Sequence, residues 1–189
     1  MSALSQYLWK KVTASTVMQA TRLCRKARAS RVLVLGENTE ALSQSFKSSV
    51  EQLDTVPLQK LTAILARSAG RVEEGKPLLG FKDGAFDLCV VSFTLHQQEP
   101  EVAEKLVREC QRIAHNSLLI DFALAERNIE LPSQFFCSLL EQFLHRGHWE
   151  TYKHYVRVGA LHGIAHRAGV SEFSDVTIWG GGIRLLLVG

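Results

Sequence analysis

The sequence lacks any long hydrophobic run. Across its 189 residues, no uninterrupted apolar stretch approaches the roughly 18–20 residues that a membrane-spanning helix needs. The beginning of the chain also lacks the continuous apolar segment that is typical of a secretory signal. We therefore expect a cytoplasmic protein without a transmembrane segment.

Cysteine is scarce, and its spacing is uninformative for metal binding. The four cysteines are Cys24, Cys89, Cys110 and Cys137, and no two of them form a CxxC motif. Three lie within apolar periodic segments, which favours buried free thiols over disulfides or a zinc site. With 46% hydrophobic and 22% charged residues, the composition is typical of a globular protein, and the length suits one domain over residues 1–189.

Acidic residues are absent from the first 31 positions. This stretch holds seven basic residues, while the remainder carries 15 basic and 19 acidic side chains. Such a composition occurs in organelle transit peptides, in segments that contact anionic membranes or nucleic acid, and on the solvated faces of helices. Leu4, Leu8 and Val12 recur every fourth residue, and no polar linker precedes the first expected strand, so we favour a helix. We expect no nucleic-acid partner and at most a weak membrane-surface contact through residues 1–31.

Hydrophobic patterns alternate between strands and helices along the chain. Continuous apolar runs predict buried strands at 31–36, 86–92 and 117–122, and 50–54 is a weaker candidate. Helical periodicity is expected at 4–28, 39–49, 57–67, 100–113, 133–145 and 151–168, and a hairpin at 175–188. This alternation predicts an α/β protein with a parallel sheet covered on both faces. Because ligands bind beyond the carboxyl ends of such strands, we consider 36–40, Asp54, 92–97 and 121–124 as candidates.

Three of these segments carry a family resemblance. They are Phe81-Lys-Asp-Gly-Ala-Phe-Asp-Leu-Cys-Val-Val-Ser-Phe-Thr-Leu-His96, Arg108-Glu-Cys-Gln-Arg-Ile113 and Leu118-Leu-Ile-Asp-Phe122. In order and spacing they resemble the class I S-adenosylmethionine-dependent methyltransferases, most of all the small quinone- and lipid-modifying type. The resemblance implies a doubly wound, mostly parallel seven-stranded sheet with an antiparallel C-terminal strand. It also implies an N-terminal helical cap over 1–28 and a helical acceptor-side region over 123–168.

The glycine motif of that family is altered here. Where the family has an acid and then Gly-x-Gly-x-Gly, this sequence has Val34, Gly36, Asn38 and Glu40. The resemblance implies that Gly36, Glu37 and Asn38 bind S-adenosylmethionine, and Asn tolerates the left-handed backbone that glycine adopts. Glu37 or Glu40 would then lie near the ammonium and sulfonium charges of the cofactor.

Further cofactor positions follow from the same resemblance. Asp54 stands 18 residues after Gly36, at the expected end of the second strand. A carboxylate at this place accepts hydrogen bonds from the ribose hydroxyls. The alternative for Asp54 is a turn residue before Pro57. Glu74 and Gly75 occupy the positions near the adenine.

The segment after the expected strand at 86–92 supplies the remaining candidates. Ser92 and Phe93 would bind the cofactor, and His96 would accept a proton from an acceptor hydroxyl. The alternative for His96 is a loop histidine that caps the helix beginning at Pro100. A histidine-rich stretch follows later and includes the i,i+4 pair His162 and His166, but we expect surface or substrate-pocket histidines there and no metal site.

These residues lead to two hypotheses of different kinds. The first is methyl transfer from S-adenosylmethionine to a small-molecule acceptor, a displacement that depends on alignment more than on acid–base power. The alternative is a degenerate methyltransferase fold that serves as a non-catalytic binding or scaffold protein. A nicotinamide-dependent enzyme is disfavoured, because Glu37 and Glu40 would face a pyrophosphate.

Overall fold

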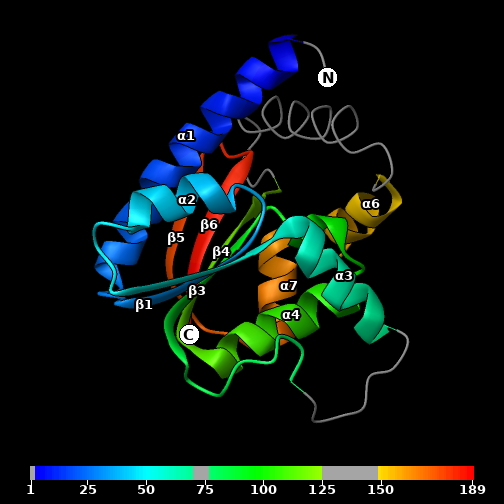
Figure 1. Ribbon diagram of the computed structural model, residues 1–189. Helices are drawn as coiled ribbons and strands as arrows, with labels where there is room; N and C mark the ends of the chain where they lie inside the picture. The colour runs from blue at the N-terminus through cyan, green and yellow to red at the C-terminus, as the bar shows by residue number, and fades with distance from the viewer. Residues whose placement is uncertain (1–2, 70–76, 125–148) are drawn as a thin grey trace.

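The structure is a computed structural model that describes residues 3–69, 77–124 and 149–189 (Figure 1). One twisted sheet runs through its centre, with the strand order β2-β1-β3-β4-β6-β5. The strands are β1 (Arg31–Gly36), β2 (Gln52–Pro57), β3 (Phe86–Ser92), β4 (Ala114–Phe122), β5 (Glu172–Ile178) and β6 (Ile183–Val188). The first four strands are parallel, whereas β6 runs antiparallel to both β4 and β5.

This topology confirms the predicted doubly wound, mostly parallel sheet and corrects its strand count. Among the described residues there are six strands rather than seven. The reason lies in the connection between β2 and β3: of the described segments, only helix α3 (Leu58–Ala69) and the coil at 77–85 lie between them. Strand β2 therefore pairs only with β1 in the described part of the chain.

Helices cover both faces of the sheet. Helices α1 (Ala3–Lys26) and α2 (Thr39–Phe46) pack together on one face, and α3, α4 (Pro100–Ile113) and α7 (Ala160–Ala168) lie on the other (Figure 1). A short 3-10 helix, η1 (Leu95–Gln97), follows β3 and contacts helix α6 (Trp149–Arg157). The helix expected over 133–145 lies outside the described residues.

The helix predicted over 151–168 is divided into α6 and α7. Gly159 has φ +100° between them, a conformation that side-chain-bearing residues avoid. A Cβ atom at Gly163 would lie only 1.8 Å from the carbonyl oxygen of Val158, so the two helix ends approach closely. The hydrophobic periodicity continues through both helices in the sequence, so the pattern predicts one helix. In the structure the turn at Gly159 divides it into two.

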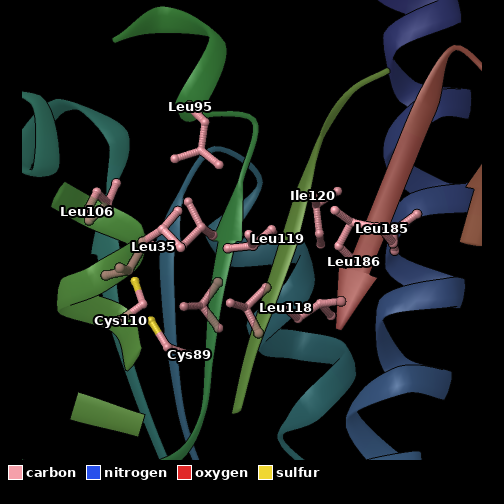
Figure 2. Close-up of a cluster of buried hydrophobic side chains, with 14 of the residues drawn as sticks. Leu35, Cys89, Leu95, Leu106, Cys110, Leu118, Leu119, Ile120, Leu185 and Leu186 are labelled. Carbon is pink, nitrogen blue, oxygen red and sulfur yellow. The ribbon is translucent and has the colours of Figure 1, made fainter. Parts of the chain in front are cut away.

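The hydrophobic core fills the space between the sheet and the helices. Figure 2 shows part of this core, with side chains from β1, β3, β4, β6 and α4, among them Leu35, Leu106, Leu119 and Leu186. Cys24, Cys89 and Cys110 are buried free thiols, as predicted, and Cys137 lies outside the described residues. Burial raises the pKa of the Cys89 thiol well above its usual range, so this thiol stays protonated and unreactive.

Helix α1 is held to the rest of the fold by its inner side. Val12, Ala20 and Leu23 are at most 3% exposed, and α1 contacts α2, β4 and β6. No helix in the described ranges is both long and apolar enough to cross a membrane.

Candidate active site

The turn after β1 is built around Gly36. This residue has φ +96°, and the following Glu37 N–H donates to the Ser92 carbonyl over 2.8 Å. A Cβ atom at position 36 would lie 1.9 Å from Thr94 Oγ1 and 2.4 Å from the Ser92 oxygen. Thr94 Oγ1 itself donates to that Ser92 oxygen over 2.9 Å. Glycine is required here because the loop after β3 packs directly against the turn.

Asn38 keeps the shape that the second glycine of the motif would provide. It adopts the left-handed conformation, with φ 56°, immediately before helix α2. This confirms the expectation that asparagine tolerates this backbone. Thr13 Oγ1 of α1 donates to Asn38 Oδ1 over 3.2 Å and fixes the side chain. Glu40 lies exposed in the first turn of α2, where a carboxylate interacts favourably with the positive end of the helix dipole.

The loop after β3 is buried beneath α1. Ser92, Phe93 and Thr94 have no exposed surface, and Phe93 has φ 43°. The Phe93 ring lies between Trp9 of α1 and Phe122 of β4, at centroid distances of 5.1 and 5.5 Å. The sequence pattern correctly places Ser92 and Phe93 beside the Gly36 turn.

Gln97 joins the two loops, a role that the sequence did not reveal. Its side-chain amide donates to Glu37 Oε1 over 2.9 Å and to the Phe93 carbonyl over 3.2 Å. The only signal in the sequence was its place among the residues that follow β3. The Gln97 contact holds the Glu37 carboxylate at the carboxyl end of β1.

His96 forms a buried pair with Asp121. His96 Nδ1 lies 2.5 Å from Asp121 Oδ1, and the side chains are 1% and 0% exposed. Asp121 also accepts hydrogen bonds from the backbone N–H groups of Leu95 and His96 at Oδ2, and of Phe122 at Oδ1. Because the Asp121 carboxylate accepts hydrogen bonds, Nδ1 must donate to it, so a neutral His96 ring carries its proton on Nδ1 and its lone pair on Nε2. The capping alternative for His96 is wrong, since Glu99 is the residue preceding α4 and His96 bonds to Asp121.

Aromatic rings surround this pair. Phe122 lies 4.8 Å from the His96 ring, and Tyr152 and Tyr155 of α6 each lie 6.3 Å from it. The Tyr155 hydroxyl donates to the Phe122 carbonyl over 2.7 Å. Burial, together with the negative charge of Asp121, raises the pKa of Tyr155 well above its usual range. Tyr155 therefore remains a neutral donor, and the rings keep the surroundings of His96 apolar, where charge interactions are strong.

Asp54 lies apart from this group. The expectation that it ends the second strand is wrong: β2 continues through the buried Val56 to Pro57, which pairs with Gly36. Asp54 pairs with Leu33 and accepts an exposed hydrogen bond from Gln52 over 2.7 Å. It is three residues, about 10 Å along the strand, before the carboxyl end. Glu74 and Gly75 lie outside the described residues.

One histidine of α6 and one of α7 contact charged groups. His154 Nδ1 lies 3.0 Å from Glu99 Oε2. His162 Nε2 lies 3.3 Å from Asp175 Oδ2 and 3.1 Å from an Arg184 guanidinium nitrogen. The guanidinium charge opposes a metal cation at His162, so we assign no metal there.

Comparisons with known proteins identify the fold. No protein-family model and no curated protein matches the sequence. The mitomycin 7-O-methyltransferase MmcR superposes with a TM-score of 0.57 at 14% identity, over 92% of this chain and 53% of that enzyme. Magnesium protoporphyrin IX methyltransferase (ChlM) from Synechocystis PCC 6803, solved with bound SAH, gives 0.54 at 14% identity, over 92% and 81% of the two chains. The chain has the class I methyltransferase fold.

An O-methyltransferase family protein from Burkholderia thailandensis has the same fold. Its TM-score is 0.56 at 19% identity, over 94% of this chain and 55% of that one. The chain thus spans about half the length of the Burkholderia and mitomycin proteins. The class I methyltransferase fold was predicted from the sequence, and the likeness to the quinone- and lipid-modifying type stays a prediction.

Proposed function

We propose that this protein transfers a methyl group from S-adenosylmethionine to a hydroxyl group of a small-molecule acceptor. The observation that carries the proposal is the buried His96–Asp121 pair, at the carboxyl ends of β3 and β4 beside the Gly36 turn. In parallel sheets this edge is where ligands bind. Residues 1–28 would form a cap over the site, and 123–168 its acceptor side.

The residues after β1 fit the methionine end of the cofactor. Gly36 and Asn38 give the turn its left-handed backbone conformation. The negative charge of the Glu37 carboxylate would attract the positive charges of S-adenosylmethionine. Asn38 Nδ2 and Ser92 Oγ are buried with no hydrogen-bond partner among the described residues. Buried polar atoms normally have partners, and these two match a ligand that carries a carboxylate.

Among the described residues, the end of β2 carries no carboxylate that could accept hydrogen bonds from the ribose. Pro57, which has neither a carboxylate nor a backbone N–H, stands opposite Gly36 at the end of β2. Loss of one charge-assisted hydrogen bond weakens binding by roughly 1.5–3 kcal/mol, or about 10- to 150-fold. We therefore expect the cofactor to bind weakly.

His96 and Asp121 would handle the proton of the acceptor. The cofactor, when bound, supplies an electrophilic methyl group. His96 Nε2 accepts the hydroxyl proton, while Asp121 orients the ring through Nδ1 and offsets the positive charge of the imidazolium. Phe122, Tyr152 and Tyr155 would exclude water from this pair. His96 would then take its proton from the acceptor hydroxyl rather than from water.

Calorimetric titration with S-adenosylmethionine and S-adenosylhomocysteine tests the cofactor. We expect both to bind with dissociation constants between about 100 µM and a few mM, which is micromolar affinity reduced by the missing ribose contact. His96→Gln should keep this affinity within about twofold, because His96 acts on the acceptor. No heat and no thermal shift at millimolar ligand would contradict the proposal.

Transfer of labelled methyl groups tests His96. The protein is incubated with methyl-labelled S-adenosylmethionine and the small-molecule fraction of a cell extract, and extractable label is counted. His96→Gln should lower the rate about 100- to 10,000-fold, the usual contribution of a general base. Equal label with the wild type and the variant would rule out His96 as the base.

A second candidate is a non-catalytic binding protein. The observations that favour it are Val34, at a position where the family resemblance implies an acid, and Pro57 rather than Asp54 at the end of β2. This candidate predicts no cofactor binding at millimolar concentration, so the same titration separates the two functions.

A further inference from the structure

Helix α1 presents one exposed stripe along its outer side. The stripe, called here the outer face of α1, recurs at intervals of three and four residues, and all its members are exposed: Tyr7, Lys11, Ala14, Met18, Arg22 and Arg25. Such spacing places side chains on one side of a helix. Over 18 residues at 1.5 Å each, the stripe is about 27 Å long. Figure 1 shows α1 along the outside of the molecule, with α2 as its neighbour.

The outer face is basic and has no acid of its own. Lys10 and Lys26 flank it, Arg28 follows the helix, and residues 1–31 contain no Asp or Glu. Lys11 Nζ lies 5.6 Å from the centre of the Tyr7 ring, and Lys26 Nζ bonds to Ser174 Oγ. Lys11, Arg22 and Arg25 are exposed, so their positive charges lie on the surface of the molecule.

The outer face also carries two large apolar side chains, Tyr7 at its beginning and Met18 between Lys11 and Arg22. Tyr7 is 57% exposed and Met18 is 64% exposed, and they are the exposed large hydrophobic residues of the described chain. They share the stripe with the basic residues Lys11, Arg22 and Arg25. The inner side of α1 is fixed by Val12, Ala20 and Leu23, so the fold itself holds the outer face in this arrangement.

We propose that the outer face of α1 docks the protein onto the surface of an anionic membrane. Basic side chains attract anionic headgroups, and Tyr7 and Met18 would enter the boundary between headgroups and acyl chains. A nucleic-acid backbone offers phosphates to the basic residues but no apolar layer to Met18, so a membrane fits this face better. The helix lies flat on the surface and does not span it, in keeping with its packed inner side.

Docking would also bring the membrane close to the candidate site. On other sides of the same helix, Trp9 contacts Phe93 and Thr13 bonds to Asn38. The docking proposal stands without the proposed methyl transfer, because vesicle binding is measured in the absence of cofactor.

Co-sedimentation of the 189-residue chain with vesicles tests the proposal. The vesicles are phosphatidylcholine alone, or phosphatidylcholine with about one third phosphatidylglycerol. We expect binding only to the anionic vesicles, and release as the salt concentration rises from about 0.1 to about 0.5 M, where screening shortens the range of charge interactions.

Two triple variants separate the outer face from net charge. Lys11→Glu/Arg22→Glu/Arg25→Glu and the control Lys60→Glu/Lys82→Glu/Lys105→Glu both change the formal charge from +3 to −3 at exposed positions. Each basic residue at an anionic surface contributes about fivefold to binding, so the first variant should bind at least about 100-fold more weakly. The control should bind the anionic vesicles with an affinity within about threefold of the wild type. Unchanged melting temperatures would show that both variants are folded.

Three outcomes would overturn the proposal. One is an equal loss of vesicle binding in both triple variants, which would make the attraction a property of net charge alone. Another is binding of the wild type to neutral and anionic vesicles alike. The third is binding to duplex DNA that depends on Lys11, Arg22 and Arg25, without binding to vesicles. In support, Met18→Ser should weaken binding to anionic vesicles several-fold, because it removes an apolar side chain from the interface.

Discussion

Asp87 and Asp121 lie at opposite ends of neighbouring parallel strands, and their partners differ. Asp87, near the amino end of β3, is 27% exposed and accepts hydrogen bonds from the Arg31 guanidinium, with the shortest at 2.7 Å. The backbone N–H groups of Ser30 and Arg31 also donate to it. Asp121, near the carboxyl end of β4, is fully buried and pairs with His96.

The two pairs differ in role: Arg31–Asp87 stabilises the fold, whereas His96–Asp121 is suited to chemistry. Arginine does not lose its proton in a protein and the pKa of Asp87 is about 2, so the Arg31–Asp87 pair stays charged at neutral pH and connects β1 to β3. An imidazole has a second ring nitrogen that can accept a proton, so the His96–Asp121 pair contains a group suited to proton transfer. The His96–Asp121 pair lies at the carboxyl edge of the sheet, where ligands bind, and the Arg31–Asp87 pair lies at the opposite edge.

The largest effect is expected from Asp121→Ala. The variant leaves His96 Nδ1 and the backbone N–H groups of Leu95, His96 and Phe122 buried without their acceptor. Breaking a buried pair of this kind costs about 3–5 kcal/mol of unfolding free energy, measured by urea denaturation. Asp121→Asn, which keeps one acceptor oxygen, should cost less. A loss below about 1 kcal/mol for Asp121→Ala would mean that the pair is not what holds this edge together.

Gly36→Ala tests the contact between the two loops at the same edge. The added Cβ would meet Thr94 Oγ1 at 1.9 Å and would force alanine into φ +96°. Overpacking and left-handed strain together should cost about 2–4 kcal/mol. Gly80→Ala is the matched control, because Gly80 has φ +74° but nothing within 4 Å of its Cβ position. Thermal unfolding of both variants should show the larger loss at Gly36, and equal losses would argue against the Thr94 contact.

Asp87→Asn tests the opposite edge and should have a smaller, pH-dependent effect. The Arg31 guanidinium lowers the pKa of Asp87 from 3.8 to about 2. A carboxyl whose pKa is lower in the folded state stabilises the fold above its unfolded pKa and loses that contribution as the pH falls through the folded value. For this partly exposed pair we expect about 1–2 kcal/mol at neutral pH. The difference between wild type and variant should shrink between about pH 4 and pH 2, and a constant difference would contradict this account.

The smallest effect is expected from Asp54→Ala. The only hydrogen bond described for its side chain comes from Gln52, on the exposed surface of β2. The unfolding free energy should change by less than about 0.5 kcal/mol, as for most surface substitutions. Because Asp54 stands before the carboxyl edge, we also expect the affinity for S-adenosylmethionine to stay within about twofold. A tenfold loss of affinity would instead assign the ribose to Asp54.

The buried strands were predictable because their signal is local. Arg31–Gly36 and Phe86–Ser92 are continuous apolar runs, and parallel strands covered on both faces have this pattern. Strand β2 was placed less well. It is an edge strand with several exposed residues and ends in Pro57, which edge strands tolerate, so its pattern resembles a turn. The error at Asp54 follows from that weak signal.

The sequence by itself determined the parallel sheet, the terminal hairpin and the turn at Gly36, because short-range hydrophobicity and backbone preference decide these features. Tertiary structure alone decided that His96 pairs with Asp121, 25 residues away, and that Thr94 fills the space beside Gly36. These contacts depend on register, which pairs Gly36 with Ser92 and Ser92 with Ile120. Register arises from the packing of all the strands together, and no local stretch of sequence contains it.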